Sequence, residues 1–385
     1  MIKKISQRVQ NLTPSGIRQF FDLVLGMKEV ISLGVGEPDF VTPWNIREAG
    51  IYALEKGYTT YTSNKGLYRL RMIISRFLKK RYGLEYDPEE EILVTVGTSE
   101  ALDLALRAIL NPGEKVLIPQ PGYVSYGPVT LLAGGEPVYL ETNLENGFKL
   151  NPQMIEKACS KNTKAIILNY PTNPTGVSYT KKELEEIKEV ALKKDLLVVS
   201  DEIYGELTYD FPHIPFPTLK GAKKNTLYLN GFSKAYAMTG WRIGYVCGSR
   251  EIISAMNKIH QYTIMCVPII SQMAACEALE NGQKAVEEMK SEYKRRREFV
   301  FRRLNEMGLN CLKPEGAFYI FPSIKNTGLS SLDFANRLLK EEKVAVVPGN
   351  AFGSCGEGFI RISYASSMDK LKEAMERMEK FLKSL

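Results

Sequence analysis

The segment 230–245 contains three residues whose types could act together on one small molecule. Lys234 lies among small residues that break regular structure, and a lysine amine in such a turn can serve as an imine-forming nucleophile. Ser233 and Arg242 flank it and could bind an anion such as a phosphate, the guanidinium as a bidentate donor. A phosphorylated aldehyde would engage all three groups at once. An isolated Ser-Lys pair usually belongs to an ordinary surface loop, so the rest of the chain must support this interpretation.

Further polar groups follow short apolar runs. Asp201 comes directly after the run 196–200, where a carboxylate needs a positive partner because an unpaired buried charge is costly. A protonated pyridine nitrogen would supply that partner. Asn173 follows the run 165–169, and it and Tyr204 could donate hydrogen bonds to a phenolic oxygen. Taken singly, each of these residues also fits a plain turn.

Two glycine-containing turns are candidate sites of close backbone approach. Gly97, Thr98 and Ser99 separate an apolar run from a helical pattern, and backbone N–H groups at a helix N-terminus favour a phosphate, although simple capping is the alternative. Gly34 and Gly36 leave backbone uncovered in a turn, which would admit a ligand. No third glycine and no helix follow them, so a dinucleotide-binding fingerprint is not present.

The cysteines and histidines argue against several kinds of site. The six cysteines are scattered without a Cys-x-x-Cys spacing, which favours reduced thiols in a cytoplasmic protein. The two histidines, His213 and His260, form no metalloprotease or Ser-His-Asp pattern, so we expect no metal centre and no triad hydrolysis. We expect His260 to be a partly buried structural residue. The first residues lack the apolar core of a signal peptide, and no apolar run is long enough to span a bilayer, so no membrane partner is expected.

Short apolar runs separated by helical patterns predict an α/β fold with a mainly parallel sheet covered by helices on both faces. Ligands of such sheets bind beyond the carboxyl ends of the strands, which is where Asp201, Asn173 and Thr98 fall. The runs expected to form strands are 92–96, 115–118, 137–140, 165–169, 196–200, 226–229 and 243–246, and the expected helices are 45–57, 67–82, 100–110, 181–194 and one that begins at Ser15 within 11–30.

The bulk composition is that of a globular protein. The chain has 385 residues, of which 44% are hydrophobic and 25% charged, enough for one large and one smaller domain. The net charge is +7, but basic and acidic residues are interleaved, and the densest basic run, 294–297, falls in a helical pattern. A solvated helix face explains this run better than nucleic-acid binding, so no nucleic-acid partner is expected.

Five motifs occur in the order found in class I/II aminotransferases: Pro171–Gly176, Ser200–Tyr204, Gly231–Lys234, Met238–Gly244 and Phe359–Ser363. The chain resembles the prokaryotic aspartate/aromatic aminotransferase branch of that family over essentially its whole length. The resemblance implies the pyridoxal-phosphate-dependent transferase fold type I, with a mainly parallel seven-stranded sheet covered by helices and a smaller α/β C-terminal domain. It further implies an N-terminal segment, 1–44, that packs with the small domain, a large cofactor-binding domain, 45–287, and the small domain itself, 288–385.

The resemblance also implies roles for the candidate residues. Lys234 would form the Schiff base with pyridoxal 5'-phosphate, Asp201 would pair with the ring nitrogen, and Tyr204 would bond the phenolic oxygen. The other implied contacts are Asn173 at the same oxygen and at the substrate, Tyr123 stacked on the ring, Thr98, Ser99, Ser233 and Arg242 at the phosphate, Tyr61 at the phosphate of the neighbouring subunit, and Arg361 with the Gly36 backbone at the substrate α-carboxylate.

The sequence around Arg361 supports its implied role independently. Residues 359–364 alternate, so the arginine points away from Ile360 and Ile362, as a residue that faces a cleft would. A surface arginine on an edge strand is the alternative.

The implied reaction is a ping-pong transfer of the amino group of an L-amino acid to a 2-oxo acid such as 2-oxoglutarate, by a cytoplasmic homodimer with shared active sites. In it the amine of Lys234 acts as general base. Some aspartate-specific members carry a lysine at the position of Ser99, and aromatic residues available for the lining, Tyr61, Tyr123 and Phe352, favour aromatic or broad donors. Aspartate stays possible, as does an alanine or diaminopimelate-pathway aminotransferase.

Two other activities occur on related chains. A carbon–sulfur β-lyase would release pyruvate and ammonia from cystathionine without an oxo acid. A cofactor-sensing transcription regulator would need an additional N-terminal DNA-binding domain, for which the roughly thirty residues before Ile31 are expected to be too few.

Overall fold

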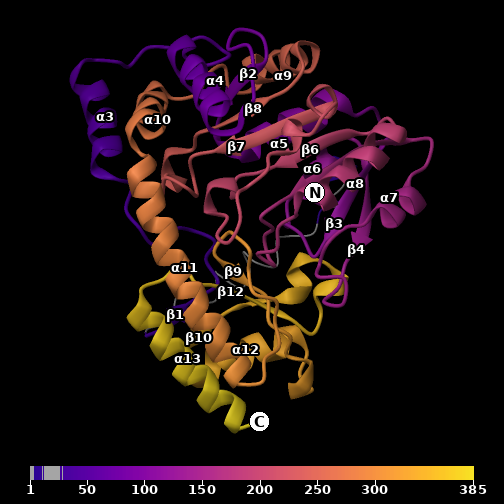
Figure 1. Ribbon diagram of the computed structural model, residues 1–385, viewed down its shortest axis with the longest axis vertical. Coiled ribbons are helices and arrows are strands. Elements are labelled where there is room, and N and C mark those ends of the chain that lie inside the picture. The colour runs from indigo at the N-terminus through magenta and orange to yellow at the C-terminus, as the bar shows by residue number, and fades with distance from the viewer. Residues whose placement is uncertain (1–3, 11, 13–26, 28) are drawn as a thin grey trace.

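The computed structural model describes residues 4–10, 12, 27 and 29–385, and the helix expected from Ser15 lies outside them. In the described chain a seven-stranded sheet forms the centre of the larger part of the molecule (Figure 1), and β8 alone runs antiparallel to its neighbours, which confirms the mainly parallel sheet. In spatial order the strands are β2 (Ile92–Thr95), β8 (Gly244–Cys247), β7 (Thr226–Gly231), β6 (Leu197–Asp201), β5 (Thr163–Asn169), β3 (Lys115–Gln120) and β4 (Glu136–Glu141).

Alternation along each strand divides the apolar side chains between the two faces of this sheet. In β3, Val116 and Ile118 join a buried cluster with α5, α6 and α9, whereas Leu117 joins a cluster with α7 and α8. Near β2 and β8 the second face is covered by α4 and α10. Because both faces are buried, the strands read as continuous apolar runs rather than as alternating ones.

The helices predicted at 45–57, 67–82, 100–110 and 181–194 are present to within a few residues, whereas the two short helices at 126–132 and 152–158 were not predicted. Thr180 forms a capping box with Glu183 at the start of α8, and Gly83 ends α4 in the left-handed conformation that favours glycine. The helix expected from Glu100 instead begins at Gly97. The helices are α1 (Gln7–Gln10), α3 (Trp44–Glu55), α4 (Tyr68–Tyr82), α5 (Gly97–Ile109), α6 (Tyr126–Leu132), α7 (Pro152–Ala158), α8 (Lys181–Lys193), α9 (Arg250–Thr263) and α10 (Ile269–Asn281).

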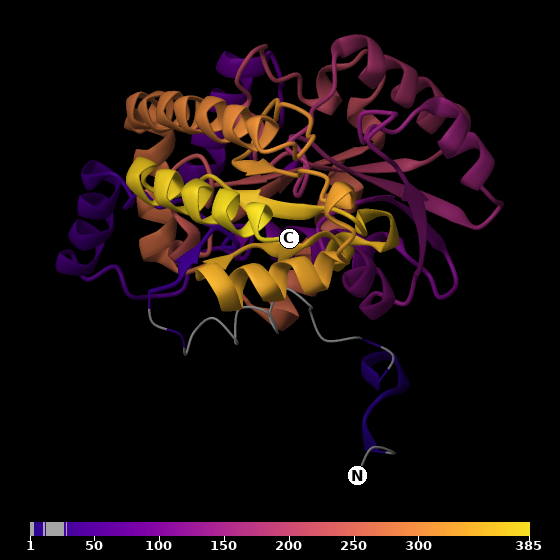
Figure 2. The ribbon, with the colours of Figure 1, turned by 90° about the horizontal axis from the view of Figure 1, so that it is seen from below.

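A second, smaller layer follows α11 (Gln283–Glu306). Its antiparallel sheet has the order β11-β12-β9, and α11, α13 and α12 lie side by side over it (Figure 2). The segment after residue 29 joins this layer, because β1 (Ile31–Ser32) pairs in parallel with β10 (Val344–Ala345). The remaining elements are β9 (Tyr319–Ile320), α12 (Ser331–Glu342), β11 (Val347–Pro348), β12 (Ile360–Ser363) and α13 (Met368–Lys383), with short 3₁₀ turns at 205–207, 216–218, 223–225, 239–241, 325–327, 349–352 and 354–356.

His260 corrects one expectation, because it is fully buried rather than partly buried. Its Nδ1 lies 2.7 Å from Glu100 Oε1, and this polar partner allows the imidazole to lie between α5 and α9. No helix in the described ranges is long and apolar enough to cross a bilayer. Over the same residues, no three His, Cys, Asp or Glu side chains are grouped as metal ligands, and the six cysteines are free thiols.

Candidate active site

A cavity of about 540 Å³ opens at the carboxyl ends of β5, β6 and β7, where the large sheet meets the small sheet and the segment after β1. This is the position at which open α/β sheets bind ligands. The predicted site residues that line it come from segments far apart in the sequence. They are Gly36, Thr98, Ser99, Tyr123, Asn173, Asp201, Tyr204, Ser233, Lys234, Arg242 and Arg361.

Lys234 lies in the turn after β7 and points its amine across the cavity. Lys234 Nζ donates a hydrogen bond to the carbonyl oxygen of Gly36 at 2.6 Å. Burial, with smaller contributions from the charges of Arg361 and Arg242, lowers the pKa of Lys234 to about 8. The amine is therefore neutral, and nucleophilic, much closer to neutral pH than an exposed lysine would be.

Asp201 ends β6 and is almost fully buried. Tyr126 Oη donates to its Oδ2 at 2.8 Å, and Asn169 Nδ2 donates to its backbone oxygen at 2.9 Å. Burial raises the pKa of Asp201 to about 6 despite the Tyr126 bond. Among the described residues Asp201 forms no ion pair, so the carboxylate still lacks the positive partner that its burial requires.

The start of α5 and the turn after β7 together form an anion-binding cradle. Gly97, Thr98 and Ser99 bring the N-terminus of α5 to the cavity, and Arg242 lies against it. Gly97 has a φ of +72°, and a Cβ there would lie 2.8 Å from Arg242 Nη2. Arg242 itself adopts a φ of +50° and donates from Nη1 to the Thr239 backbone oxygen at 3.0 Å, which fixes its direction.

Arg361 lies in the middle strand of the small sheet, so the alternative of a surface arginine on an edge strand is wrong. It is 3% exposed, and its guanidinium stacks 4.4 Å from the ring centre of Tyr319. Nη1 donates to Asn173 Oδ1 at 2.8 Å and Nη2 donates to the Gly34 oxygen at 2.5 Å. Nε is buried and has no hydrogen-bond partner within the described chain, and burial lowers the pKa of the guanidinium.

Two tyrosines of the site were not predicted. Tyr126, three residues after Tyr123, bonds Asp201, and Tyr319 lies with its hydroxyl 2.9 Å from that of Tyr204. Burial raises the pKa of Tyr126, Tyr204 and Tyr319, so all three are neutral donors or acceptors. Tyr319 falls in an apolar run, 316–321, within the expected small domain, and that run marked no site residue; the sequence around Tyr126 carried no signal either.

The predicted aromatic lining needs correction. Tyr61 is 81% exposed and lies outside the cavity. Phe352 is buried behind the site, with its ring centre 4.9 Å from the Arg361 guanidinium. Of the three aromatic residues proposed to line the site, this chain therefore contributes only Tyr123 directly, because the Phe352 side chain packs in a separate apolar cluster with Phe321 and Phe359.

Comparison with known proteins agrees with this geometry. Residues 28–378 match the family model "Aminotransferase class I and II". The chain is 51% identical to an aspartate aminotransferase of Pyrococcus abyssi and 48% identical to aromatic-amino-acid aminotransferase 2 of Thermococcus litoralis, in both cases over 98% of each chain. A crystal structure of an aromatic aminotransferase from Pyrococcus horikoshii OT3 superimposes with a TM-score of 0.91 at 49% identity, covering 96% of this chain and 99% of that one.

The chain belongs to the class I and II aminotransferase family and is a pyridoxal-phosphate-dependent transaminase with the fold that was predicted. The residues present fit this cofactor. The cavity combines an amine of lowered pKa at Lys234, a buried carboxylate without a cation at Asp201, and a glycine-lined cradle beside Arg242. These are the groups that an aldehyde, a ring nitrogen and a phosphate respectively require.

Proposed function

We propose that this aminotransferase uses aromatic or a broad range of L-amino acids as donors and a 2-oxo acid such as 2-oxoglutarate as acceptor. This proposal rests on the positively charged side chains that line the cavity. In the described chain the cationic side chains that line it are Lys234, Arg242 and Arg361, and each has a part in the reaction itself. Ser99 is neutral, so a side-chain carboxylate, that of 2-oxoglutarate included, meets hydroxyl groups rather than a further cation on this wall, whereas Tyr123 and the other lining tyrosines offer aromatic surface to an aromatic donor.

Arg361 is proposed to bind the α-carboxylate of the substrate. Its guanidinium is fixed by Asn173 and Gly34, and the unpartnered Nε leaves donor capacity for an anion. Planar, bidentate recognition of carboxylates is what arginine provides best. The backbone of Gly36 also lines the cavity, against Tyr319, on which Arg361 stacks, and it would contact the substrate beside the arginine.

Lys234 is proposed to hold the cofactor covalently and to act as the general base. When bound, pyridoxal phosphate supplies an electron sink for the charge that develops at the substrate α-carbon. Lys234 Nζ, with its pKa of about 8, would take the α-proton of the substrate and deliver it to the aldehyde carbon of the cofactor, as a base tuned close to working pH does best. An amino acid gives up its amino group in the first half-reaction, and an oxo acid accepts it in the second.

The other lining residues are proposed to orient the ring. Asp201 would accept a hydrogen bond from the protonated ring nitrogen and so gain its missing positive partner. Asn173 and Tyr204 would bond the phenolic oxygen, and Tyr123 would stack on the ring, where it would also contact the substrate. The phosphate would be held by Thr98, Ser99, Ser233 and Arg242.

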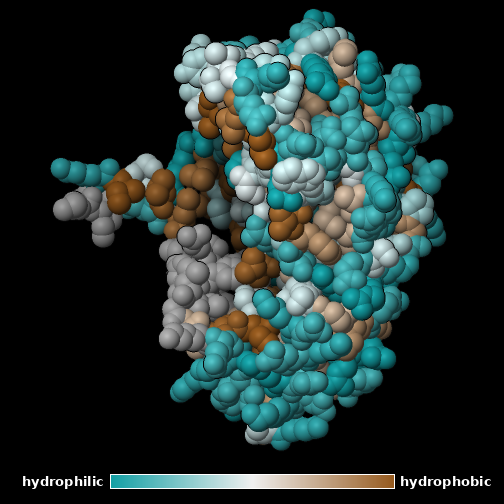
Figure 3. Space-filling view, turned by 90° about the vertical axis from the view of Figure 1, so that its left-hand side faces the viewer, coloured by the Kyte–Doolittle hydropathy of each residue, from teal (hydrophilic) through white to brown (hydrophobic). Residues whose placement is uncertain are grey.

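We also propose a homodimer in which Tyr61 reaches the phosphate of the partner's site. Figure 3 views the molecule from the side on which α3 lies in Figure 1, and apolar side chains gather along this face. A large exposed apolar area of this kind is typical of an interaction surface. Large apolar and aromatic side chains are exposed on α3, on the loop after α3 and around the end of α9. They are Trp44, Ile51, Tyr52, Leu54, Tyr58, Tyr61, Tyr262, Ile264 and Met265.

We further propose that the chain divides into an N-terminal segment, 1–44, a large domain, 45–287, and a small domain, 288–385. We also propose that the protein is cytoplasmic. The buried cluster that joins Ile31 and Leu33 to the helices after residue 288 supports the division. Six free thiols support a reducing compartment.

A donor screen with 2-oxoglutarate tests the substrate assignment. Aromatic donors are expected to give the highest kcat/KM, and equal rates for aromatic, acidic, diamino and small donors would defeat the aromatic preference and leave the broad specificity. Pyruvate and ammonia formed from cystathionine without an oxo acid would instead indicate a β-lyase. Lys234→Ala should remove both turnover and the visible absorbance of the cofactor-loaded protein, and a variant that retains both would overturn the assignment of Lys234.

A further inference from the structure

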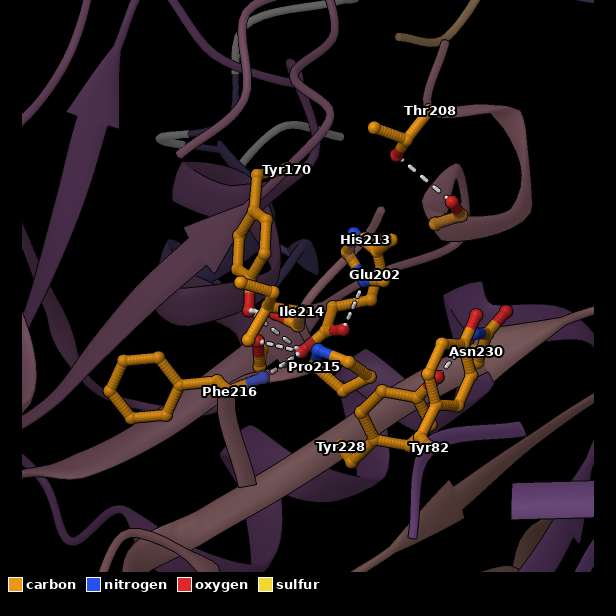
Figure 4. A network of polar contacts seen from close by, with 12 residues as sticks. Tyr82, Tyr170, Glu202, Thr208, His213, Ile214, Pro215, Phe216, Tyr228 and Asn230 are labelled. Carbon is orange, nitrogen blue, oxygen red and sulfur yellow. Dashed lines mark hydrogen bonds and ion pairs between the residues drawn. The ribbon is translucent and has the colours of Figure 1, made fainter. Parts of the chain in front are cut away.

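A buried carboxylate next to the site has no part in the chemistry proposed above. Glu202 follows Asp201 directly, its side chain is fully buried, and four groups contact it (Figure 4). Oε1 lies 2.7 Å from Ser200 Oγ, 2.9 Å from Phe216 N and 3.1 Å from Tyr170 Oη. Oε2 lies 2.6 Å from His213 Nε2. Both carboxylate oxygens are therefore used, and by groups from three separate segments.

The partner histidine is equally enclosed. Because a carboxylate only accepts, His213 Nε2 must carry the proton of the bond to Glu202. Its Nδ1 is buried and has no hydrogen-bond partner within the described residues. The ring lies 5.3 Å from that of Tyr170 and 6.2 Å from that of Tyr82, and a Cβ at Gly205 would lie 2.8 Å from it. Among the described residues, the polar contact of the imidazole is therefore Glu202.

This pair connects the strand ends that carry the predicted cofactor ligands. Tyr170 lies three residues before Asn173, on the loop that leaves β5, while Glu202 lies one residue after Asp201, beyond β6. Asn169 completes the connection, since its side chain donates to the Asp201 backbone oxygen at 2.9 Å and accepts from the Asn173 backbone nitrogen at 3.0 Å. A movement of Glu202 would therefore displace both ligands.

We propose that Glu202 and His213 are positioning residues of the transamination reaction, which hold Asp201 and Asn173 in place against the cofactor ring. The inference rests on the proposed function, in which Asp201 accepts from the ring nitrogen. Apolar residues of similar volume would fill the same space at no greater cost, since a buried charged group is weak evidence for stability. A fully satisfied hydrogen-bond network, by contrast, fixes one arrangement of the segments that it joins.

The test compares two ligands of the full-length protein freed of cofactor: pyridoxal phosphate and its 1-deaza analogue, in which CH replaces the ring nitrogen. The wild type should prefer pyridoxal phosphate, because only that ligand offers the N–H that Asp201 accepts. His213→Gln should reduce this preference, measured as the ratio of the two dissociation constants, by about tenfold, the size of effect found when a residue that orients a metal ligand is removed. Ser200→Ala removes one hydrogen-bond donor to Glu202 without adding volume, and it should also reduce the preference for pyridoxal phosphate. The test therefore remains possible if the histidine variant does not fold.

His260→Gln is the matched control, since it breaks the other buried histidine–glutamate pair, which lies in the first turn of α5, on the proposed phosphate side of the cavity, and both ligands of the test carry the same phosphate. It should lower the melting temperature and leave the ratio unchanged. If His213→Gln and Ser200→Ala lower only the melting temperature and keep the wild-type ratio, the positioning role is wrong. If Asp201→Asn also keeps that ratio, the failure lies instead in the assignment of Asp201 to the ring nitrogen.

Discussion

Arg361 Nη1 donates a hydrogen bond to Asn173 Oδ1 at 2.8 Å, and this bond joins the middle strand of the small sheet to the loop that leaves β5 of the large one. The stacking of the guanidinium on Tyr319 fixes it from one face. Because the arginine is held before a ligand arrives, little side-chain entropy remains to be lost when a carboxylate binds. Orientation of this kind is one of the larger sources of catalytic advantage.

Replacement of Arg361 by lysine should therefore reduce kcat/KM by about 100-fold, mainly through KM, because lysine keeps the charge but loses the planar fork and the stacking. Steady-state kinetics with an aromatic donor measure this loss. Arg337→Lys is the control and should show wild-type kinetics, because Arg337 lies on α12 outside the cavity, where it pairs with Glu341 and lies over the Phe381 ring. Equal KM values for the two variants would rule out Arg361 as the carboxylate ligand.

Gly97→Ala should weaken the binding of pyridoxal phosphate by about tenfold or more, because the new Cβ would displace the Arg242 guanidinium and a hydrogen bond to a charged group is lost. Gly83→Ala is a close control, since Gly83 has a φ of +70° and open space around its Cβ position. Both variants should lose about 1 kcal/mol of stability from the left-handed backbone. Only Gly97→Ala should lose affinity, and binding of pyridoxal without its phosphate should change little. Similar affinity for pyridoxal phosphate in the two variants would contradict the cradle.

Asp201→Asn should stabilise the cofactor-free protein at high pH. The pKa of Asp201 is raised from 3.8 to about 6 in the folded chain, so its contribution to stability is fully present below pH 3.8 and is lost as the pH rises through 6. At pH 8 the buried carboxylate therefore costs up to about 3 kcal/mol, which asparagine avoids. Thermal unfolding from pH 4 to pH 8 measures the difference, which should vanish at the acid end. With saturating cofactor at pH 8, the wild type should instead be more stable than Asp201→Asn. If Asp201→Asn is less stable than the wild type at pH 8 without cofactor, the destabilising buried charge at Asp201 is disproved.

Asp201 and Lys234 show why much of this site could be predicted from the sequence. Each lies at or just beyond the end of an apolar run, and the carboxyl ends of neighbouring parallel strands meet at one edge of a sheet. Local pattern alone therefore brings them together. The seven strands and the helices α3, α4, α5 and α8 could be predicted for the same reason, since their periodicity is a local property.

Tyr126 and Tyr319 show what local pattern could not predict. Tyr126 reaches Asp201 because the start of α6 lies beside the end of β6. Tyr319 reaches Tyr204 because β9 pairs with β12, where the small sheet meets the large one. The same dependence on strand order made Arg361 ambiguous, since the sequence does not reveal whether β12 is an edge or a middle strand. Contacts of this kind depend on tertiary packing between distant segments.

The exposed Tyr61 allows the proposed shared sites to be tested by mixing two inactive proteins. Lys234→Ala lacks the nucleophile, and Tyr61→Ala should bind pyridoxal phosphate weakly, because the phenol would be missing from the phosphate of the partner's site. In a hybrid dimer both defects fall in one site, and the other site receives intact Lys234 and Tyr61. Random reassociation makes half of the dimers hybrid, so the mixture should recover about a quarter of the wild-type activity at limiting cofactor, as expected for an interface with twofold symmetry. Each parent protein alone, taken through the same reassociation, provides the baseline. A monomeric mass by sedimentation, or a mixture no more active than its parents, would exclude the shared site.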